Sequence, residues 1–480
     1  MEFITDIVTF VNNILWSYVL IATLIACGLW FTFKTKFVQF RMIGHMFKLL
    51  LETGADKVKG NKHLNNGNNE RKISSFEAFA VSIAGRVGTG NLAGVATAIV
   101  IGGPGAVFWM WVMALIGSAS AFIESTLAQM YKLKGKDSFL GGPAYYIEIG
   151  LKMKWLSVAF AIFTILTFGF AFNSVQSNTL SAALGQAFGL SPVLIGIITT
   201  VLTIIVIFGG IQSIAKVSSV IVPIMAIGYV LIALIIIAMN ITQLPDVIKI
   251  IVSNAFGIKQ AVGGGIGAAL MQGIRRGLFS NEAGMGSAPH AAATANVSHP
   301  VKQGFIQALS VFTDTLLICS CTAFIILFSG SPLDGSINGV QLTQFALNSK
   351  IGSFGTYYIG FILIFFVFSS ILGNYYYGEA NVTYLVKNRG SETRKKIIFL
   401  YRVLVSANVM AGAIMSLDLA WNIADITMGM MALCNMAGIV LLGKYAIRLL
   451  KDYQNQLKEG KDPVFNKEIV PEIKNQLECW

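Results

Sequence analysis

Residues 85–94 read GRVGTGNLAG, and within them GTGNLA at 88–93 fits the G-x-G-x-x-G/A pattern of dinucleotide-binding turns. That pattern requires a strand before the glycines and a helix after them, inside a soluble βαβ unit. Here the glycines lie in the middle of one apolar stretch, residues 76–101. Glycine lowers helicity, and irregular backbone at mid-membrane depth is tolerated only inside protein or beside a cavity. We therefore interpret the motif as a break in a membrane helix, with helix packing on small residues as the alternative.

The composition is that of a membrane protein. Of the 480 residues 55% are hydrophobic and 12% are charged, with a mean hydropathy of +0.69, whereas soluble domains carry roughly 25% charged residues. The net charge of +12 comes from basic residues in short loops between apolar runs, so it reports topology and not a nucleic-acid partner. The five cysteines lack metal-site spacing, and no Ser/His/Asp constellation is present. We expect no enzymatic activity, no cofactor and no metal site besides that of a transported ion.

Eleven stretches have the roughly 20 apolar residues that a membrane span needs. Nine basic residues lie between the first two stretches and five more at 387–396, but only Lys249 and Lys350 lie in the opposite loops. Because cytoplasmic loops are enriched in Lys and Arg, we predict a multi-pass protein of the plasma (inner) membrane with its N-terminus outside and its C-terminus in the cytoplasm. The stretches are at about 14–33, 76–101, 105–131, 155–186, 192–210, 215–239, 255–279, 303–329, 354–386, 396–416 and 419–449.

A second interrupted stretch follows five spans after the first, with AVGGGIG at 261–267. Two glycine-broken spans in corresponding positions of two halves point to the central site of a transporter. We therefore predict an all-α polytopic fold with two inverted five-helix repeats and one extra N-terminal span. The predicted parts are an N-terminal span and cytoplasmic loop at 1–75, the repeats at 76–240 and 241–450, and a solvated cytoplasmic tail at 451–480.

The chemistry of the first break follows from its backbone. The N–H groups freed at 89–91 lie at the N-terminus of a half-helix, where a carboxylate is favoured. The carbonyl groups freed at 84–87 suit a small cation such as Na⁺. One loop can therefore hold a carboxylate and a cation side by side.

Four longer motifs resemble the alanine or glycine:cation symporter family, also called the sodium:alanine symporters. The resemblance covers essentially the whole membrane region, and it implies a LeuT-like fold with Na⁺-coupled, sometimes H⁺-coupled, uptake of alanine and glycine. The motifs are GTGNLAGVATAI at 88–99, GGPGAVFWMWVMALIG at 102–117, RGLFSNEAGMGSAPHAAATA at 276–295 and SSILGNYYYGEAN at 369–381.

Carried onto this chain, the resemblance implies a set of site residues. The Na⁺ ligands would be the carbonyls of Ala84 and Val87 with the hydroxyls of Ser369 and Ser370, although these hydroxyls alternatively bond to their own helix. Asn91 either binds a second ion or caps the outer half-helix. Expected to line the substrate are Thr89, Gly90, Asn91, Gln176, Gly264, Gly265 and Met271, of which Gln176 alternatively forms an interhelical hydrogen bond. Expected gate or coupling residues are Arg86, Asn281, Glu282 and Asp314.

Arg275 and Arg276 bear on where the second break lies. A break at SNEAG, residues 280–284, would leave both arginines deep in the bilayer, at a cost of at least about 2.5 kcal/mol each. We therefore predict the break at 263–267, which brings the arginines to the cytoplasmic face and makes FSNEAGMGSAP, residues 279–289, an inner gate. Asn374 stands where the family favours an aromatic residue, so the size of the substrate pocket stays open.

The function expected from these features is Na⁺-coupled import of alanine or glycine across the lipid bilayer. An H⁺-coupled carrier of the same fold is the first alternative. A channel is the second, and it would need a ring of charges or carbonyls contributed by an oligomer. The oligomeric state, the stoichiometry and the preference for D- or L-alanine are open.

Overall fold

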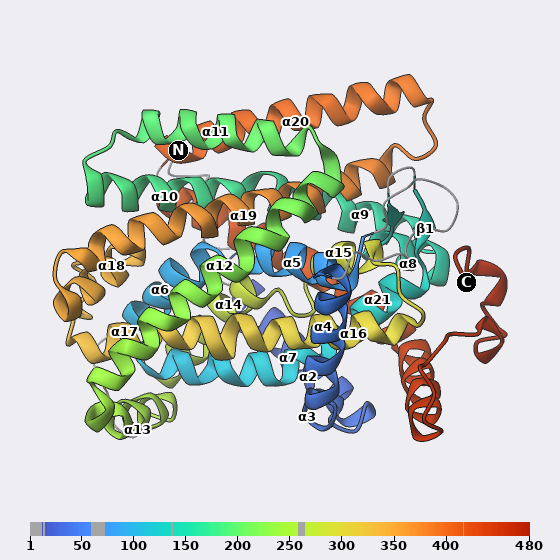
Figure 1. Ribbon diagram of the computed structural model, residues 1–480, viewed down its shortest axis with the longest axis horizontal. Helices are drawn as coiled ribbons and strands as arrows, with labels where there is room; N and C mark the ends of the chain where they lie inside the picture. Colours follow the sequence, from blue (N-terminus) through green and yellow to red (C-terminus); the bar gives the residue numbers. More distant parts are fainter. Residues whose placement is uncertain (1–11, 13–14, 59–72, 136–137, 258–264, 416) are drawn as a thin grey trace.

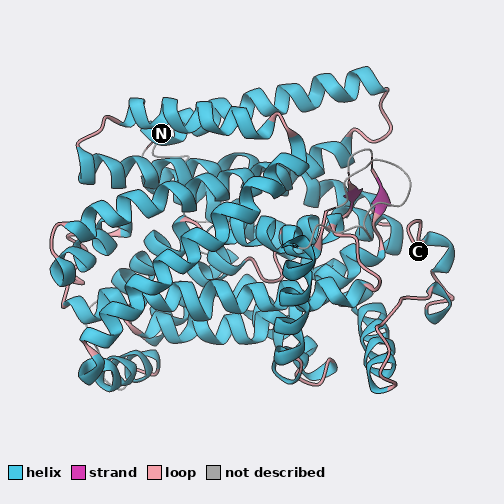
Figure 2. Cartoon of the chain, in the orientation of Figure 1, coloured by secondary structure: helices cyan, strands magenta, loops and turns pink. Residues whose placement is uncertain are grey.

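The computed structural model describes residues 12, 15–58, 73–135, 138–257, 265–415 and 417–480. Within these residues the chain is built of helices, and the only strands form one short hairpin near the C-terminal end (Figure 2). The hairpin pairs β1, Leu133–Lys134, with β2, Phe139–Leu140, in antiparallel register. The fold is therefore all-α, as the sequence predicts.

The N-terminal segment lies outside the two halves of the fold. A π-helical turn, Leu15–Val19, leads into α2, Leu20–Lys34, which packs on α7 and on the last long helix, α21. Two further helices follow, α3 at Val38–Arg41 and α4 at Ile43–Val58.

The first half begins at a capping box in which Ser74 and Glu77 bond to each other's backbone N–H groups. Its first helix is interrupted, since α5 ends at Arg86 and a π-helical turn at Gly90–Gly94 leads into the second part, α6. The elements are α5 at Ser75–Arg86, α6 at Val95–Gly102, α7 at Gly105–Met130, α8 at Pro143–Leu151, α9 at Lys154–Thr164, α10 at Phe172–Phe188, α11 at Pro192–Ile207 and α12 at Gly210–Met239.

The second half also begins with an interrupted helix, in which α14 and α15 are separated by six residues. The elements are α13 at Leu244–Ala255, α14 at Ile266–Asn281, α15 at Ala288–Thr294, α16 at Pro300–Val311, α17 at Ser320–Ser329, α18 at Gly339–Ile351, α19 at Phe354–Leu385, α20 at Ser391–Ile414 and α21 at Leu417–Lys458. The division of the chain into repeats at 76–240 and 241–450 stays a prediction.

The long helices form layers with the two interrupted helices between them. In Figure 1, α11 and α20 run side by side along one edge, α10 and α19 lie beneath them, and α7 and α16 run along the opposite edge. The interrupted helices run in opposite directions, because α14 packs on α6 while α15 packs on α5. Gly102 of α6 lies against Ala268 and Gln272 of α14, and a Cβ there would meet the Cβ of Gln272 at 2.9 Å.

Length and composition identify seven helices among the described residues that can cross a membrane. The bent pair α5 and α6, with an angle of 49° between its halves, makes an eighth, while α2 and α11 are shorter apolar helices. The total of eleven spans therefore stays a prediction. The spans differ in how far they are buried. Of the most apolar 18 residues of α12, 28% are buried inside the protein, whereas 72% are buried in the span formed by α16 and α17. The exposed apolar face of α12 fits contact with lipid.

The predicted position of the second break is wrong. Gly265 caps α14, which then runs without interruption from Ile266 to Asn281, so the break occupies residues 282–287. Gly263 and Gly264 lie outside the described residues. The chain leaves the helix at Glu282, which adopts the left-handed conformation with φ +56°.

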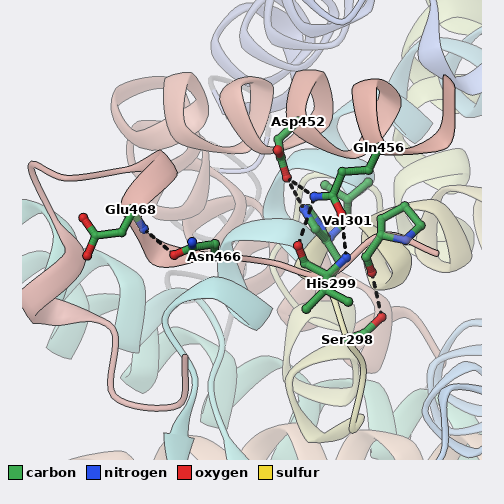
Figure 3. A network of polar contacts seen from close by, with 9 residues as sticks. Ser298, His299, Val301, Asp452, Gln456, Asn466 and Glu468 are labelled. Carbon is green, nitrogen blue, oxygen red and sulfur yellow. Dashed lines mark hydrogen bonds and ion pairs between the residues drawn. The ribbon is translucent and has the colours of Figure 1, made fainter. Parts of the chain in front are cut away.

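The predicted solvated tail is also wrong, because residues beyond α21 pack on the helix bundle. Ser298, which precedes α16, accepts the Phe465 N–H at 2.9 Å, and the Trp480 indole donates to the Gln129 carbonyl at 3.0 Å. The neighbouring His299 accepts the Val301 N–H at 3.2 Å through Nδ1, while its Nε2 lies 3.2 Å from the Asp452 carboxylate (Figure 3). Aromatic side chains and backbone hydrogen bonds thus hold the tail, although the segment is mixed in charge.

Candidate functional site

The first break lies where the sequence predicts it. Helix α5 ends because Val87 has extended backbone angles, φ −80° and ψ 92°. The Gly88 N–H then donates to the Asn91 side-chain oxygen at 2.9 Å. Asn91, in the first turn of the outer half-helix, thus bonds back to the backbone of the break, and its two predicted roles both stay predictions.

Two helices from different halves of the chain converge on this break. Gln176 of α10 accepts the Thr89 N–H through Oε1 at 3.1 Å, and Ser370 of α19 donates to the Val87 carbonyl at 3.2 Å. A Cβ at Gly88 would lie 2.8 Å from the Gln176 amide nitrogen and would also collide with the Ser370 hydroxyl. Glycine is required here so that both side chains can reach the backbone.

Ser369 and Ser370 do not point in the same direction. The Ser369 hydroxyl donates to the Phe366 carbonyl of its own helix at 3.1 Å, whereas the Ser370 hydroxyl reaches across to the break. Ser369 thus bonds to its own helix, which is the alternative given for both serines, whereas Ser370 makes the predicted contact with the Val87 carbonyl. Ala84 is fully buried in α5, one turn before Val87.

The second break is tied to the first through Asp314. The Asp314 carboxylate accepts hydrogen bonds from Asn91 at 2.7 Å and from Ser280, just before the second break, at 2.7 Å. Asn281 supports the break itself, because its side chain accepts the Ala283 N–H at 3.0 Å and donates to Thr315 at 3.2 Å. Asp314 thus bonds to residues at both interruptions at once.

Charged side chains are buried on the α5 and α15 side of the breaks. Arg86 donates to the Ser310 hydroxyl and to the Gln307 carbonyl, and it interacts electrostatically with the three acidic residues of the region. Each of these acids is fully buried, and one oxygen of Glu282 has no hydrogen-bond partner among the described residues. The acids are Glu124, which accepts the Gly284 N–H at 3.2 Å, Glu282, which accepts the Ser287 hydroxyl at 2.6 Å, and Asp314.

The arginines of α14 are buried, and they precede the second break instead of following it, which removes the basis for predicting them at the cytoplasmic face. Arg276 bonds through both terminal nitrogens to the Asp425 carboxylate, at 3.3 and 3.1 Å, and Arg275 lies 3.4 Å from it. Each guanidinium also stacks on an indole, Arg275 on Trp16 and Arg276 on Trp421. The prediction counted the cost of two unpaired charges, whereas the structure gives both arginines a shared carboxylate partner on α21.

Aromatic rings close one side of the first break. Phe279 of α14 lies between Phe172 and Trp421, with ring centroids 4.4 and 4.5 Å apart. A Cβ at Gly90 would lie 2.9 Å from the Phe279 ring, so the backbone of the half-helix packs directly on this cluster. Sequence reasoning missed these residues, because Phe in an apolar stretch carries no signal of its own.

Several predicted substrate residues are not brought to the break. Gly265 is exposed at the start of α14, and Met271 is half-buried along the same helix, ten residues before Asn281. Gly264 lies outside the described residues. These assignments depended on a break at 263–267.

Asn374 is a polar residue near the first break whose whole side-chain amide lacks a hydrogen-bond partner among the described residues. It is fully buried on α19, one turn beyond Ser370, and neither atom of its amide has a hydrogen-bond partner among the described residues. Gly373 packs on Gly85, and Tyr377 on the next turn also lies against Gly85. Asn374 is therefore on the face of α19 that meets the first interrupted helix.

Two oppositely directed interrupted helices, held together by buried polar side chains inside a layered helical bundle, define a membrane transporter of the LeuT-like fold. The solved structure of MhsT in complex with L-phenylalanine has this fold, with a TM-score of 0.56 over 85% of this chain and 93% of that one, at 14% identity. The chain belongs to the sodium:alanine symporter family, whose model matches residues 1–467. The chain is thus a multi-pass membrane transporter and not an enzyme.

Two relatives show the range of the family. The chain is 49% identical over 479 residues to the Bacillus subtilis (strain 168) protein named "Probable sodium/glutamine symporter GlnT", covering all of this chain and 96% of that protein. It is 39% identical over 411 residues to the "Sodium/proton-dependent alanine carrier protein" of Bacillus sp. (strain PS3), covering 83% of this chain and 92% of that one.

Proposed function

We propose that this protein imports alanine and glycine together with Na⁺, and that both bind at the first break. The observation that carries the proposal is the pairing of opposite backbone groups there. The Thr89 N–H faces Gln176, while the Val87 carbonyl, two residues earlier, faces Ser370. A donor for an anion and an acceptor for a cation thus lie within three residues of the chain.

Gln176 supports a carboxylate site at the Thr89 N–H. Its amide oxygen already accepts the Thr89 N–H at 3.1 Å, as a carboxylate oxygen would. The N-terminus of the half-helix that starts at Gly90 adds a favourable dipole. A substrate carboxylate therefore replaces the Gln176 oxygen, and the freed side chain remains available to bond to the substrate.

The Na⁺ site that we propose uses neutral oxygens. Carbonyl and hydroxyl oxygens are hard ligands of the kind that such cations prefer. The Val87 carbonyl and the Ser370 hydroxyl, 3.2 Å apart, provide two of them, with the Ala84 carbonyl one turn earlier as a third. Na⁺ there would order the end of α5 and thereby the Thr89 N–H, so that each ligand favours binding of the other.

The space beside the break favours a small side chain. Gly88 is crowded by Gln176 and Ser370, and Gly90 by Phe279, so that even a Cβ at either glycine would overlap with a neighbour. Alanine and glycine carry the smallest side chains among the amino acids and suit such a site.

Uptake into proteoliposomes tests this proposal. Labelled alanine should accumulate with an inward Na⁺ gradient and not with an equal K⁺ gradient, and excess glycine should compete better than leucine. Accumulation that ignores Na⁺ but follows an inward pH gradient would refute the ion assignment. Preferential uptake of leucine or phenylalanine would refute the substrate.

H⁺ coupling is the alternative, and the buried acids favour it. Asp314 and Glu282 are fully buried, and ionisable side chains inside a membrane protein commonly belong to proton pathways. The relative from strain PS3 is named as sodium/proton-dependent. Under this alternative, Glu282→Gln removes the response to a pH gradient but leaves binding of alanine intact.

Glutamine is a second candidate substrate because of Asn374. A buried amide without partners can bond to the amide of a glutamine side chain, which an aromatic residue could not do. The relative GlnT is named for glutamine. If glutamine is carried, Asn374→Leu should lower glutamine uptake by about tenfold relative to alanine uptake, since an unpaired buried polar group costs roughly 1–3 kcal/mol; an unchanged ratio would exclude this role.

A further inference from the structure

A surface pocket lies away from the breaks, at the end of the bundle where α12 begins and α19 ends. It is formed by the first residues of α12, the last turns of α19 and the first turns of α20, with the loop before β2 at its rim. The loop between α19 and α20 belongs to the basic set that predicts the cytoplasmic side. The pocket therefore opens at the cytoplasmic boundary of the membrane.

The walls of this pocket carry an excess of positive charge. Arg394, Lys395, Lys396 and Arg402 line it, together with one acid, Glu379. Arg402 is neutralised by its ion pair with Glu379 at 3.0 Å. Of the remaining three cations, Lys395 forms an exposed pair with Glu392, and exposed pairs of this kind contribute little.

Two further features of the pocket favour binding of an anion. Arg394 is held by a hydrogen bond from Nη2 to the Lys387 carbonyl at 2.8 Å, while its Nε is buried without a partner among the described residues. Helix α20 starts at Ser391, which lines the pocket, and its N-cap residue Gly390 provides no side-chain cap. Free N–H groups at a helix start add to the attraction of the three cations for a phosphate group.

The opposite wall of the pocket is apolar and continues onto the lipid-facing surface. Phe208 and Phe399 line it with 44% and 57% of their surface exposed, and their ring centroids are 6.0 Å apart. Beyond them, α11 and α20 lie side by side (Figure 1) and expose large apolar residues such as Ile205 and Leu404. A ligand in this pocket thus meets cations at one end and hydrocarbon surface at the other.

We infer that this pocket binds an anionic phospholipid of the cytoplasmic leaflet. Its phosphate lies against Arg394 and Lys396 at the start of α20, and its acyl chains lie along Phe208 and Phe399. Basic pockets between membrane helices recognise anionic head groups in this manner. The bound lipid joins α12 and α20 to α19, the helix that carries Ser370.

Lipid binding to the full-length protein tests the inference. The delipidated protein in detergent is titrated with phosphatidylglycerol or phosphatidylcholine, and bound lipid is counted by native mass spectrometry. The double variant Lys395→Gln/Lys396→Gln should bind phosphatidylglycerol about 25-fold more weakly, since each such cation contributes roughly a fivefold factor near a membrane surface. The matched control, Lys451→Gln/Lys467→Gln, removes two exposed lysines outside the pocket and should bind as the unchanged protein does.

Further arms separate a lipid from other occupants. Phe208→Ala/Phe399→Ala should also weaken binding of phosphatidylglycerol, and inorganic phosphate at millimolar concentration should not displace the lipid. Equal binding by the pocket variant and the control would overturn the inference. Full displacement by phosphate with no effect of the Phe variants would overturn it too, because the pocket would then hold a small anion only. If the double variant is not monodisperse, Lys396→Gln alone serves in its place.

Discussion

Ser369 and Ser370 offer a matched pair for testing the proposed Na⁺ site. Ser370 donates to the Val87 carbonyl across the helix interface, and Ser369 donates to the Phe366 carbonyl within its own helix. Both hydroxyls are fully buried, so replacement by alanine removes the same atom from similar surroundings. Only Ser370→Ala removes an oxygen that faces the break.

The expected effect follows from the strength of a bond to a charged group, about 1.5–3 kcal/mol. Loss of one such contact should raise the Na⁺ concentration for half-maximal alanine uptake by about ten- to hundredfold in Ser370→Ala. Ser369→Ala should change it by less than about twofold. The measurement is initial uptake into proteoliposomes over a range of Na⁺ concentrations at fixed ionic strength.

Two outcomes would refute this reasoning. If both variants shift the Na⁺ dependence equally, the direction of the hydroxyls in the structure does not determine which one binds the ion. If Ser370→Ala keeps the Na⁺ dependence of the unchanged protein, the carbonyl and hydroxyl at this break are not part of the ion site. Alanine binding measured without Na⁺ serves as the control for damage to the substrate site.

Three further predictions concern other parts of the structure. Gly88→Ala should lower uptake by about tenfold or more with normal expression, because its Cβ would overlap with Gln176 and overpacking costs roughly 1–3 kcal/mol; normal uptake would contradict the geometry of the break. Asp425→Asn should lower the melting temperature by several degrees, because it leaves Arg276 buried and unpaired at a cost of about 3–5 kcal/mol, and an unchanged melting curve would show that the arginine is solvated. Burial lowers the pKa of His299 to about 3. The unfolded chain therefore binds more protons than the folded protein between about pH 6.5 and 3, and the folded state should become less stable as the pH decreases through that window. In thermal melts at pH 7.5 and 5, the melting temperature of His299→Asn should change less between the two pH values than that of the unchanged protein. An equal change in both proteins would contradict the lowered pKa of His299.

The first break could be predicted from the sequence because glycine carries the signal. Gly88 and Gly90 lower helicity within an apolar stretch, and the structure interrupts the helix beside them. The second break could not, because the chain leaves the helix at Glu282, a residue that rarely adopts positive φ. The three glycines at 263–265 attracted the prediction instead, although Gly265 only caps the start of α14.

Pairings between distant segments set the other limits of prediction. Arg276 finds its counter-ion 149 positions later in the chain, on a helix whose approach no local pattern reveals. Ser369 and Ser370 illustrate the same limit at short range, since neighbouring residues on a helix point about 100° apart. A motif that contains both serines does not say which of them faces the break.

Asp314 connects the two breaks through hydrogen bonds. Its carboxylate accepts a hydrogen bond from Asn91, which lies in the first turn of the outer half of the first interrupted helix, and another from Ser280, which precedes the second break. Bonds to a charged acceptor contribute roughly 1.5–3 kcal/mol each. A movement that pulls one half-helix away from Asp314 breaks one of these bonds, and both bonds are kept only if Asp314 and the two half-helices move together. In the proposed mechanism Na⁺ and substrate order the first break, and the shared carboxylate makes the second break respond to the same event. Coupling then needs no direct contact between the ion and the second interrupted helix. It needs only that the protein binds Na⁺ and substrate more tightly in one arrangement of the helices around Asp314 than in the other.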